Sequence, residues 1–265
     1  MNYVLKTGHA GAERLESVHA LYGEESCYLL KAIGIKPNLR ILDAGCGTGQ
    51  MSAWMSNKVG SNGAIIAVDN SMEQLALANE KLKSLNTNNV TFICKNIEDL
   101  TVEDVGKIDI FYARLVLVHT KSPIDLIKRI KRICNKNTII AFEEPITDTS
   151  FCQPESTAFN LHLKLYQQLG QISKLDFNIG EKLIGIMLRA GIQLQGIRKV
   201  QRAFNSETAK LIAYRRTLEC SDKYLKYNLI NKSDLDTLLF ELKKLAIENY
   251  FISGVQMTQV WGNFT

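Results

Sequence analysis

Ile41-Leu42-Asp43-Ala44-Gly45-Cys46-Gly47-Thr48-Gly49 is the stretch of sequence that decides the fold. It begins as a short apolar strand, turns through three glycines and leads into a helical pattern over about residues 50–59. A strand, a glycine-rich turn and a helix in this order are typical of the ligand-binding loop of an open α/β sheet. The glycines allow a tight turn and let a ligand approach the backbone closely.

On either side of this loop, β-rich runs alternate with helical patterns, which predicts a mainly parallel sheet with helices on both faces. The predicted strands of the core are residues 40–43, 64–68, 90–94, 108–113 and 138–142. Helices are predicted at 24–33, at 50–59, from the Ser-x-x-Gln capping box at Ser71, and from Ser122-Pro123. Together these elements form a core over about residues 38–145.

After Pro145 the pattern changes. Residues 150–190 are mainly helical, and three helical stretches are expected between about 206 and 250. Two further strands are predicted at 193–204 and 254–264, and a C-terminal strand buried in the sheet leaves no independent second domain. We therefore expect one domain over residues 1–265, with a Rossmann-like, seven-stranded, mostly parallel sheet. The helical segments at about 150–190 and 205–250 are expected to form a lid over one end of that sheet.

Composition excludes several classes of protein. The 265 residues carry a formal net charge of +5 and are 46% hydrophobic, which is ordinary for a globular protein. No apolar run approaches the roughly 18–20 residues of a membrane span, and the first residues lack a signal pattern, so we expect a cytoplasmic protein. The six cysteines are scattered and do not indicate a zinc site. So mild a positive charge does not favour nucleic acid as a partner.

Two carboxylates indicate which ligand the glycine loop binds. Asp69 stands twenty residues after Gly49, where it can accept hydrogen bonds from both ribose hydroxyls of an adenosine-type cofactor. Asp43 directly precedes the loop, where it would repel a pyrophosphate but attract an ammonium and a sulfonium. A dinucleotide fingerprint would also have a small residue where this chain has Gln50. These observations point to S-adenosylmethionine rather than to a nicotinamide dinucleotide.

The stretch Leu42 to Gly49 resembles the first motif of the class I S-adenosylmethionine-dependent methyltransferases. Within that superfamily, the sequence is similar to the small-molecule branch that includes the ubiquinone/menaquinone biosynthesis methyltransferases. The resemblance covers roughly residues 38–145, and residues 180–191 and 254–264 look like the family's last helix and last strand. It implies cofactor contacts from Asp43, Gly45, Gly47 and Gly49 to the methionine part, from Asp69 to the ribose, from Asn70, Met72, Asn96 and Ile97 to the adenine, and from Arg114 near the ammonium.

Two of the implied contacts need comment. Where the family usually has Asp, this chain has Asn96, whose amide oxygen can still accept a hydrogen bond from the adenine amino group. Tyr3 is a further cofactor candidate, because an N-terminal arm that folds over the cofactor would bring it close.

Methyl transfer from a sulfonium depends mainly on alignment and on the exclusion of water, so the sequence leaves the catalytic residue unknown. His119, after the fourth strand of the core, is a candidate base. Glu144 and its neighbour Glu143 end the fifth strand, and one of the pair is expected to point toward the ligand. His162 and Tyr166 are one helical turn apart and are expected near the acceptor. Hydrogen bonding, surface charge or packing are the alternative roles of these residues.

Motifs that the sequence lacks argue against some kinds of methyl-transfer reaction. No Asn/Asp-Pro-Pro-aromatic loop for methylating a base amino group follows the fourth strand. Arg114 stands where metal-assisted catechol methylation needs an acid, so no metal is expected. We expect an S-adenosylmethionine-dependent methyltransferase that acts on a small, partly apolar acceptor and releases S-adenosylhomocysteine. An RNA or protein methyltransferase and a non-catalytic cofactor-binding scaffold are the alternatives. The sequence leaves a homodimer open and does not identify the acceptor.

Overall fold

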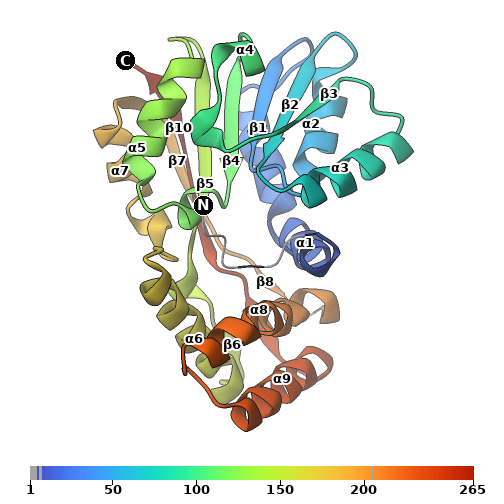
Figure 1. Cartoon of the computed structure of the whole chain (residues 1–265), viewed down its shortest axis with the longest axis vertical. Coiled ribbons are helices and arrows are strands. Elements are labelled where there is room, and N and C mark those ends of the chain that lie inside the picture. Colours follow the sequence, from blue (N-terminus) through green and yellow to red (C-terminus); the bar gives the residue numbers. More distant parts are fainter. Residues whose placement is uncertain (1–4, 6–7, 205) are drawn as a thin grey trace.

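A seven-stranded sheet forms one half of the molecule in the computed structural model, which describes residues 5, 8–204 and 206–265 (Figure 1). The strand order is β3-β2-β1-β4-β5-β10-β7. Strands β1 to β5 are parallel, whereas β10 is antiparallel to both β5 and β7. The strands are β1 (Arg40–Ala44), β2 (Ala64–Asp69), β3 (Val90–Cys94), β4 (Ile110–Arg114), β5 (Ile139–Ile146), β7 (Ile192–Val200) and β10 (Gln256–Phe264). This confirms the predicted Rossmann-like, mostly parallel sheet and its inserted C-terminal strand.

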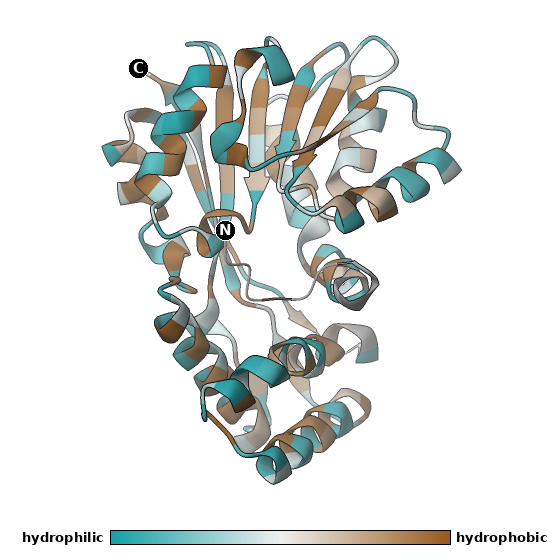
Figure 2. Cartoon of the chain, in the orientation of Figure 1, coloured by the Kyte–Doolittle hydropathy of each residue, from teal (hydrophilic) through white to brown (hydrophobic). Residues whose placement is uncertain are grey.

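Helices cover the sheet because alternate residues of each strand are buried on opposite faces. Ile41 packs with Met55 in one core, while its neighbour Leu42 packs with Ile127 in the other. In Figure 2 the strands are accordingly coloured as largely hydrophobic. The helices of this half are α1 (His9–Ala32), α2 (Gln50–Val59), α3 (Met72–Ser84), α4 (Val102–Val105), α5 (Pro123–Ile130) and α7 (Leu183–Arg189).

The other half of the molecule consists of helices and a small second sheet (Figure 1). Its helices are α6 (Thr157–Ser173), α8 (Glu207–Lys226) and α9 (Lys232–Ile247). The small sheet pairs β6 (Cys152–Gln153), β9 (Phe251–Ser253) and β8 (Ala203–Phe204) in antiparallel fashion. Helix α8 contacts α1, α6 and α9, and so joins this half to the sheet.

The sequence-based prediction was wrong in three places. Helix α1 begins at His9 rather than near residue 24, because Val18 and Tyr22 pack against α8, a partner far away in the chain. Two helices, not three, lie between 206 and 250, since α8 runs unbroken for 20 residues. The small sheet was not predicted, because its strands are only two or three residues long and pair across about 100 residues (β6 with β9) and about 50 residues (β8 with β9) of sequence. No helix within the described residues is both long and apolar enough to cross a membrane.

Candidate functional site

A cavity lies between the carboxyl ends of the parallel strands and helices α1, α6 and α8. The wall consists of Leu5, Arg14, Leu15, Val18, Tyr22, Asp43, Gly45, Cys46, Gly47, Thr48, Gln50, Met51, Asp69, Asn70, Gln74, Lys95, Asn96, Ile97, Tyr112, Arg114, Leu115, Val116, Val118, His119, Pro145, Thr147, Tyr166, Arg216 and Val255. The cavity therefore connects the glycine loop at the edge of the sheet with side chains of the three helices.

The glycine loop forms one edge of this cavity, and its backbone requires glycine. Gly45 has φ +72°, and a Cβ atom there would stand 2.7 Å from a Cγ atom of Val116. Asp69, at the end of β2, fixes the loop: its carboxylate accepts hydrogen bonds from the Gly47 N–H at 3.0 Å and the Ser71 N–H at 2.9 Å. The loop conformation and the position of Asp69 therefore depend on each other.

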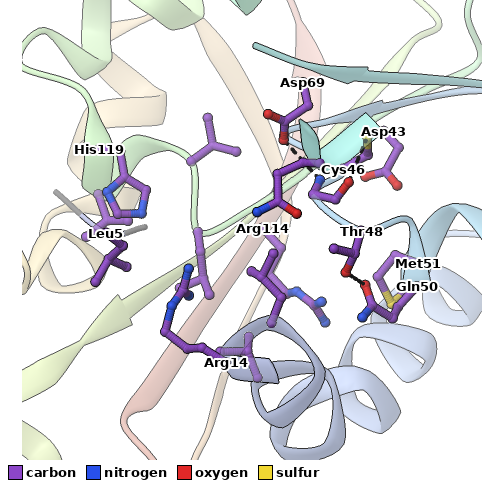
Figure 3. A pocket seen from close by; sticks show the side chains of 18 of the residues that line it. Leu5, Arg14, Asp43, Cys46, Thr48, Gln50, Met51, Asp69, Arg114 and His119 are labelled. Atoms are coloured by element: carbon purple, nitrogen blue, oxygen red, sulfur yellow. Dashed lines mark hydrogen bonds between the residues drawn. The ribbon is translucent and has the colours of Figure 1, made fainter. Parts of the chain in front are cut away.

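Asp43 and Asp69 give this end of the cavity its negative charge (Figure 3). Burial raises the pKa of Asp43 to about 6, although a 2.5 Å hydrogen bond from the Ser52 hydroxyl and the charge of Arg114 act in the opposite direction. Burial also raises the pKa of Asp69, against the hydrogen bonds that its carboxylate accepts from backbone N–H groups. Two buried carboxylates attract a cationic ligand strongly because so little water screens them.

The expected adenine-side residues fall into two groups. Asn70, Asn96 and Ile97 line the cavity, and the Asn70 amide donates to the side-chain oxygen of Asn96 at 3.3 Å. Met72 is 67% exposed and lies outside the cavity wall. Gly49 also lies outside the wall, at the start of α2, where a Cβ would press against Ala78. Tyr3, the remaining cofactor candidate, is outside the described residues.

Glu143 does not point toward the ligand, contrary to one reading of the Glu143-Glu144 pair. Its side chain is fully buried within the sheet, where it accepts hydrogen bonds from the Tyr112 hydroxyl at 2.5 Å and the Gln259 amide at 2.7 Å. Tyr112 itself lines the cavity, as does Arg114, whose guanidinium donates to the Ser26 hydroxyl at 3.0 Å. Glu143 therefore supports the wall from behind.

Glu144 also lies behind the wall rather than in it. Its carboxylate accepts hydrogen bonds from the backbone N–H groups of Val116, Leu117 and Val118 at 2.9, 2.7 and 3.1 Å. Burial raises its pKa to about 8 despite these three bonds. The turn it holds carries Leu115, a non-glycine residue with φ +58°, into the cavity. Glu144 is thus a positioning residue, and the expectation that it faces the ligand is wrong.

The two candidate histidines occupy different places. His119 lines the cavity, where burial, and secondarily the charge of Arg14, lower its pKa to about 3. His162 is buried between α6 and α8, and its Nδ1 lies 2.7 Å from the Thr217 hydroxyl. That hydroxyl donates to the Ala213 carbonyl, so it accepts from an Nδ1–H of a neutral His162. His162 therefore packs helices together, whereas Tyr166, one turn later, reaches the cavity.

Sequence reasoning missed the part of the wall that comes from α1 and α8. Arg14, Leu15, Val18 and Tyr22 lie on α1, and Arg216 lies on α8. Arg14 donates to both carboxylate oxygens of Glu219 on α8, at 3.1 and 2.9 Å. Leu15, Val18 and Tyr22 are spaced three and four residues apart and so lie on one helical face, a periodic signal that was present in the sequence. Nothing in the sequence around Arg216 marks it as part of a site.

Known proteins resemble this chain in sequence and in fold. The family described as a methyltransferase domain matches residues 35–215. Over 78 residues the chain is 35% identical to the ubiquinone/menaquinone biosynthesis C-methyltransferase UbiE of Proteus mirabilis, covering 29% of this chain and 31% of that protein. It thus spans less than a third of that relative's length.

Solved structures match over most of the chain. A protein described as a putative methyltransferase from Bacillus halodurans superposes with a TM-score of 0.59 at 16% identity, over 90% of this chain and 98% of that one. The [4+2]-cyclase SpnF gives a TM-score of 0.55 at 15% identity, over 91% and 81%. At such identities the likeness concerns the fold.

The chain therefore belongs to the methyltransferase domain family, and more specifically to the class I S-adenosylmethionine-dependent methyltransferases. The residues present fit the cofactor of that class. Asp43 suits its ammonium and sulfonium charges, Asp69 stands where ribose hydroxyls are bound, and Gly45 leaves open a space that a Cβ would narrow. Among the described residues, no group of three or more His, Cys, Asp or Glu side chains could hold a metal ion.

Proposed function

We propose that this chain is an enzyme that transfers the methyl group of S-adenosylmethionine to a small, partly apolar acceptor. The observation that carries the proposal is one cavity with two chemically different ends. Asp43 and Asp69 supply an acidic end, whereas Val18, Tyr22 and Val255, which belong to one apolar cluster, contribute wall at the helical end. The helical half covers the carboxyl edge of the sheet, which supports an enclosed acceptor rather than a macromolecular one (Figure 1).

The protein's contribution to such a reaction is alignment. When bound, the cofactor supplies a methyl group that is already activated, so a residue that attacks it is not needed. Glu144 fixes the turn that carries Leu115, Val116 and Val118 into the wall, which gives the acceptor a rigid boundary. A rigid boundary that excludes water holds two reactants in one orientation and removes competing hydrogen bonds.

A strong general base is not part of this proposal. His119 is the cavity histidine, and a pKa of about 3 makes it too weak a base to take a proton efficiently at pH 7. It is neutral there and is suited to a hydrogen bond with the acceptor. We therefore infer that the acceptor's nucleophile reacts without a strongly held proton, or loses that proton to solvent before it enters.

Two other functions are weighed by the same experiment. The chain would be incubated with methyl-labelled S-adenosylmethionine in three parallel reactions. The first contains a metabolite extract, the second total RNA and the third a lysate protein fraction. We expect label in the small-molecule fraction, and much less with the Asp43→Asn variant. Label in RNA or protein would contradict the small acceptor. Calorimetric binding of S-adenosylhomocysteine without any label transfer would favour a non-catalytic scaffold.

A further inference from the structure

The four cationic side chains of the cavity wall differ in their interaction partners. The wall contains Arg14, Lys95, Arg114 and Arg216. Arg14 is paired with Glu219, and Lys95 donates to both carboxylate oxygens of Asp104 at 2.9 and 2.7 Å. The charge of Arg114 acts on Asp43 at the cofactor end. Arg14 and Lys95 are therefore paired with carboxylates of the protein, and the charge of Arg114 acts on a carboxylate at the cofactor end.

Arg216 differs from the other three. It projects from α8 and packs over the ring of Tyr166 on α6, with its guanidinium carbon 4.7 Å from the ring centroid. Across the described part of the chain, the structure gives Arg216 no carboxylate partner. A half-buried guanidinium in a partly apolar cavity is costly unless an anion pairs with it. Its position thus leaves a positive charge for a ligand to neutralise.

The ring beneath Arg216 is held firmly. Tyr166 stacks on Phe177 with ring centroids 4.2 Å apart and planes inclined by 16°. Both rings are buried, so Tyr166 is a fixed platform for the guanidinium. A guanidinium that rests its face on a ring keeps its N–H edge available, and that edge matches a planar carboxylate through two parallel hydrogen bonds.

A second donor stands at the same end of the cavity. The Tyr22 hydroxyl accepts a hydrogen bond from the Val255 N–H at 2.8 Å, so its own hydrogen is left to donate. Burial raises the pKa of Tyr22 to about 12, with the charge of Arg216 acting against it, so the hydroxyl stays protonated near neutral pH. One positive charge and one neutral donor suit a singly charged carboxylate better than a doubly charged phosphate.

We propose that Arg216, stacked on Tyr166, binds a carboxylate group of the methyl acceptor, which is therefore an apolar carboxylic acid. This inference rests on the proposed function, since it names the class of the molecule at the helical end of the same cavity. Val18 and Val255 contact the apolar part of that molecule, and Arg216 orients it by its acidic group.

Matched pairs of acids and amides test the inference directly. Hexanoate, octanoate and 3-phenylpropanoate would be titrated by calorimetry against hexanamide, octanamide and 3-phenylpropanamide, with the chain saturated with S-adenosylhomocysteine at pH 7.5. We expect at least one acid to bind about tenfold more tightly than its amide, because only the acid pairs with the guanidinium. Equal binding of every pair, or no binding of either member, would overturn the inference.

Variants locate the preference. Arg216→Gln should reduce it to within about twofold, and Arg216→Lys, which keeps the charge but loses the planar edge, should leave an intermediate preference. Arg202→Gln is the matched control, because Arg202 also packs over an aromatic ring, that of Phe204, but lies outside the cavity wall. A preference that survives in Arg216→Gln would contradict the inference. Should that variant fail to fold, an unchanged preference in Arg216→Lys would do the same.

The two proposals fail in distinguishable ways. S-adenosylhomocysteine affinity and label transfer report on the proposed function, whereas the difference between acid and amide reports on Arg216. Arg216→Gln should keep its S-adenosylhomocysteine affinity within about twofold, because the charge of Arg216 is not among those that act on Asp43 or Asp69, the carboxylates proposed to hold the cofactor. Loss of that affinity would place Arg216 at the cofactor end and overturn its assignment to the acceptor.

Discussion

The two ends of the cavity are built in different ways. The cofactor end is formed by one continuous loop, within residues 43–48, and by side chains at the ends of neighbouring strands, such as Asp69 and Arg114. The acceptor end is formed by side chains of α1, α6 and α8. These helices are far apart in the sequence, and Tyr22 and Arg216, for example, are 194 residues apart. The comparison teaches that a ligand common to a large family is bound by local sequence, while a particular ligand is bound by the tertiary fold.

The largest effect should come from the charge at the cofactor end. Asp43→Asn removes the carboxylate that attracts the cofactor's ammonium, and we expect S-adenosylhomocysteine binding to weaken by about 1.5–3 kcal/mol. Asp109→Asn is the control, because Asp109 accepts a hydrogen bond from the Arg40 N–H outside the cavity wall. Calorimetry with equal losses in the two variants would contradict a special role for Asp43.

The same residue predicts a pH dependence. The folded pKa of Asp43 is about 6, and a ligand ammonium favours its ionised form. Affinity for S-adenosylhomocysteine should therefore be constant above pH 7 and fall by up to tenfold per pH unit as the pH drops below 6. In Asp43→Asn the affinity should be weak and should not change across this range. If the wild-type affinity rose as the pH fell, ionised Asp43 would not be the group that binds the ammonium.

At the boundary between the two ends, Glu144→Gln should destabilise the fold. The amide can accept through one oxygen only, so at least one of the N–H groups of Val116, Leu117 and Val118 loses its partner. At pH 4 the Glu144 carboxyl is protonated in the folded chain, where its pKa is about 8, and largely in the unfolded chain, so its ionisation does not bias the comparison, and we expect a loss of about 1–3 kcal/mol in urea unfolding. Glu155→Gln, at an exposed position, should change stability by less than about 0.5 kcal/mol. Equal stability of the two variants would show that Glu144 does not hold the turn.

The glycine loop offers a test with a closely matched control. Gly45→Ala and Gly60→Ala introduce a side chain at nearly the same backbone angle, φ +72° and +70°, and so share a strain of roughly 1–2 kcal/mol. Gly60 has open space around it, whereas a Cβ at Gly45 would meet Val116. We expect Gly45→Ala to lose more stability than Gly60→Ala because of this contact, and Gly45→Ala alone to lose affinity for S-adenosylhomocysteine, by about tenfold. Unchanged affinity would mean that the loop does not contact the cofactor.

The smallest effect concerns His162, between α6 and α8. Burial lowers its folded pKa well below 6.5, so below pH 6.5 the unfolded chain takes up a proton that the folded chain does not. Stability should thus fall with decreasing pH by up to about 1.4 kcal/mol per unit more in the wild type than in His162→Gln. Parallel unfolding curves between pH 4.5 and 7 would show that His162 is not buried as a neutral ring.

The cofactor end and the sheet could be predicted because their signals are local. Residues 41–49 carry the strand, the turn and the helix start, and the capping box at Ser71 marks the start of α3. The acceptor end could not be predicted, because Arg216 acquires its role only when α8 packs against α6 and brings it over Tyr166. His162 and Tyr166 illustrate the limit: both were expected near the acceptor, yet the rotation of α6 directs only Tyr166 into the cavity.

A crystal structure of the chain with S-adenosylhomocysteine tests the central claim most directly, namely that one cavity holds the cofactor at its acidic end and the acceptor at its helical end. We predict ribose hydroxyls on Asp69, the ammonium beside Asp43, and the sulfur facing the space bounded by Tyr166 and Arg216. Ligand bound elsewhere, or a sulfur open to bulk solvent with α6 and α8 packed away from it, would contradict the claim.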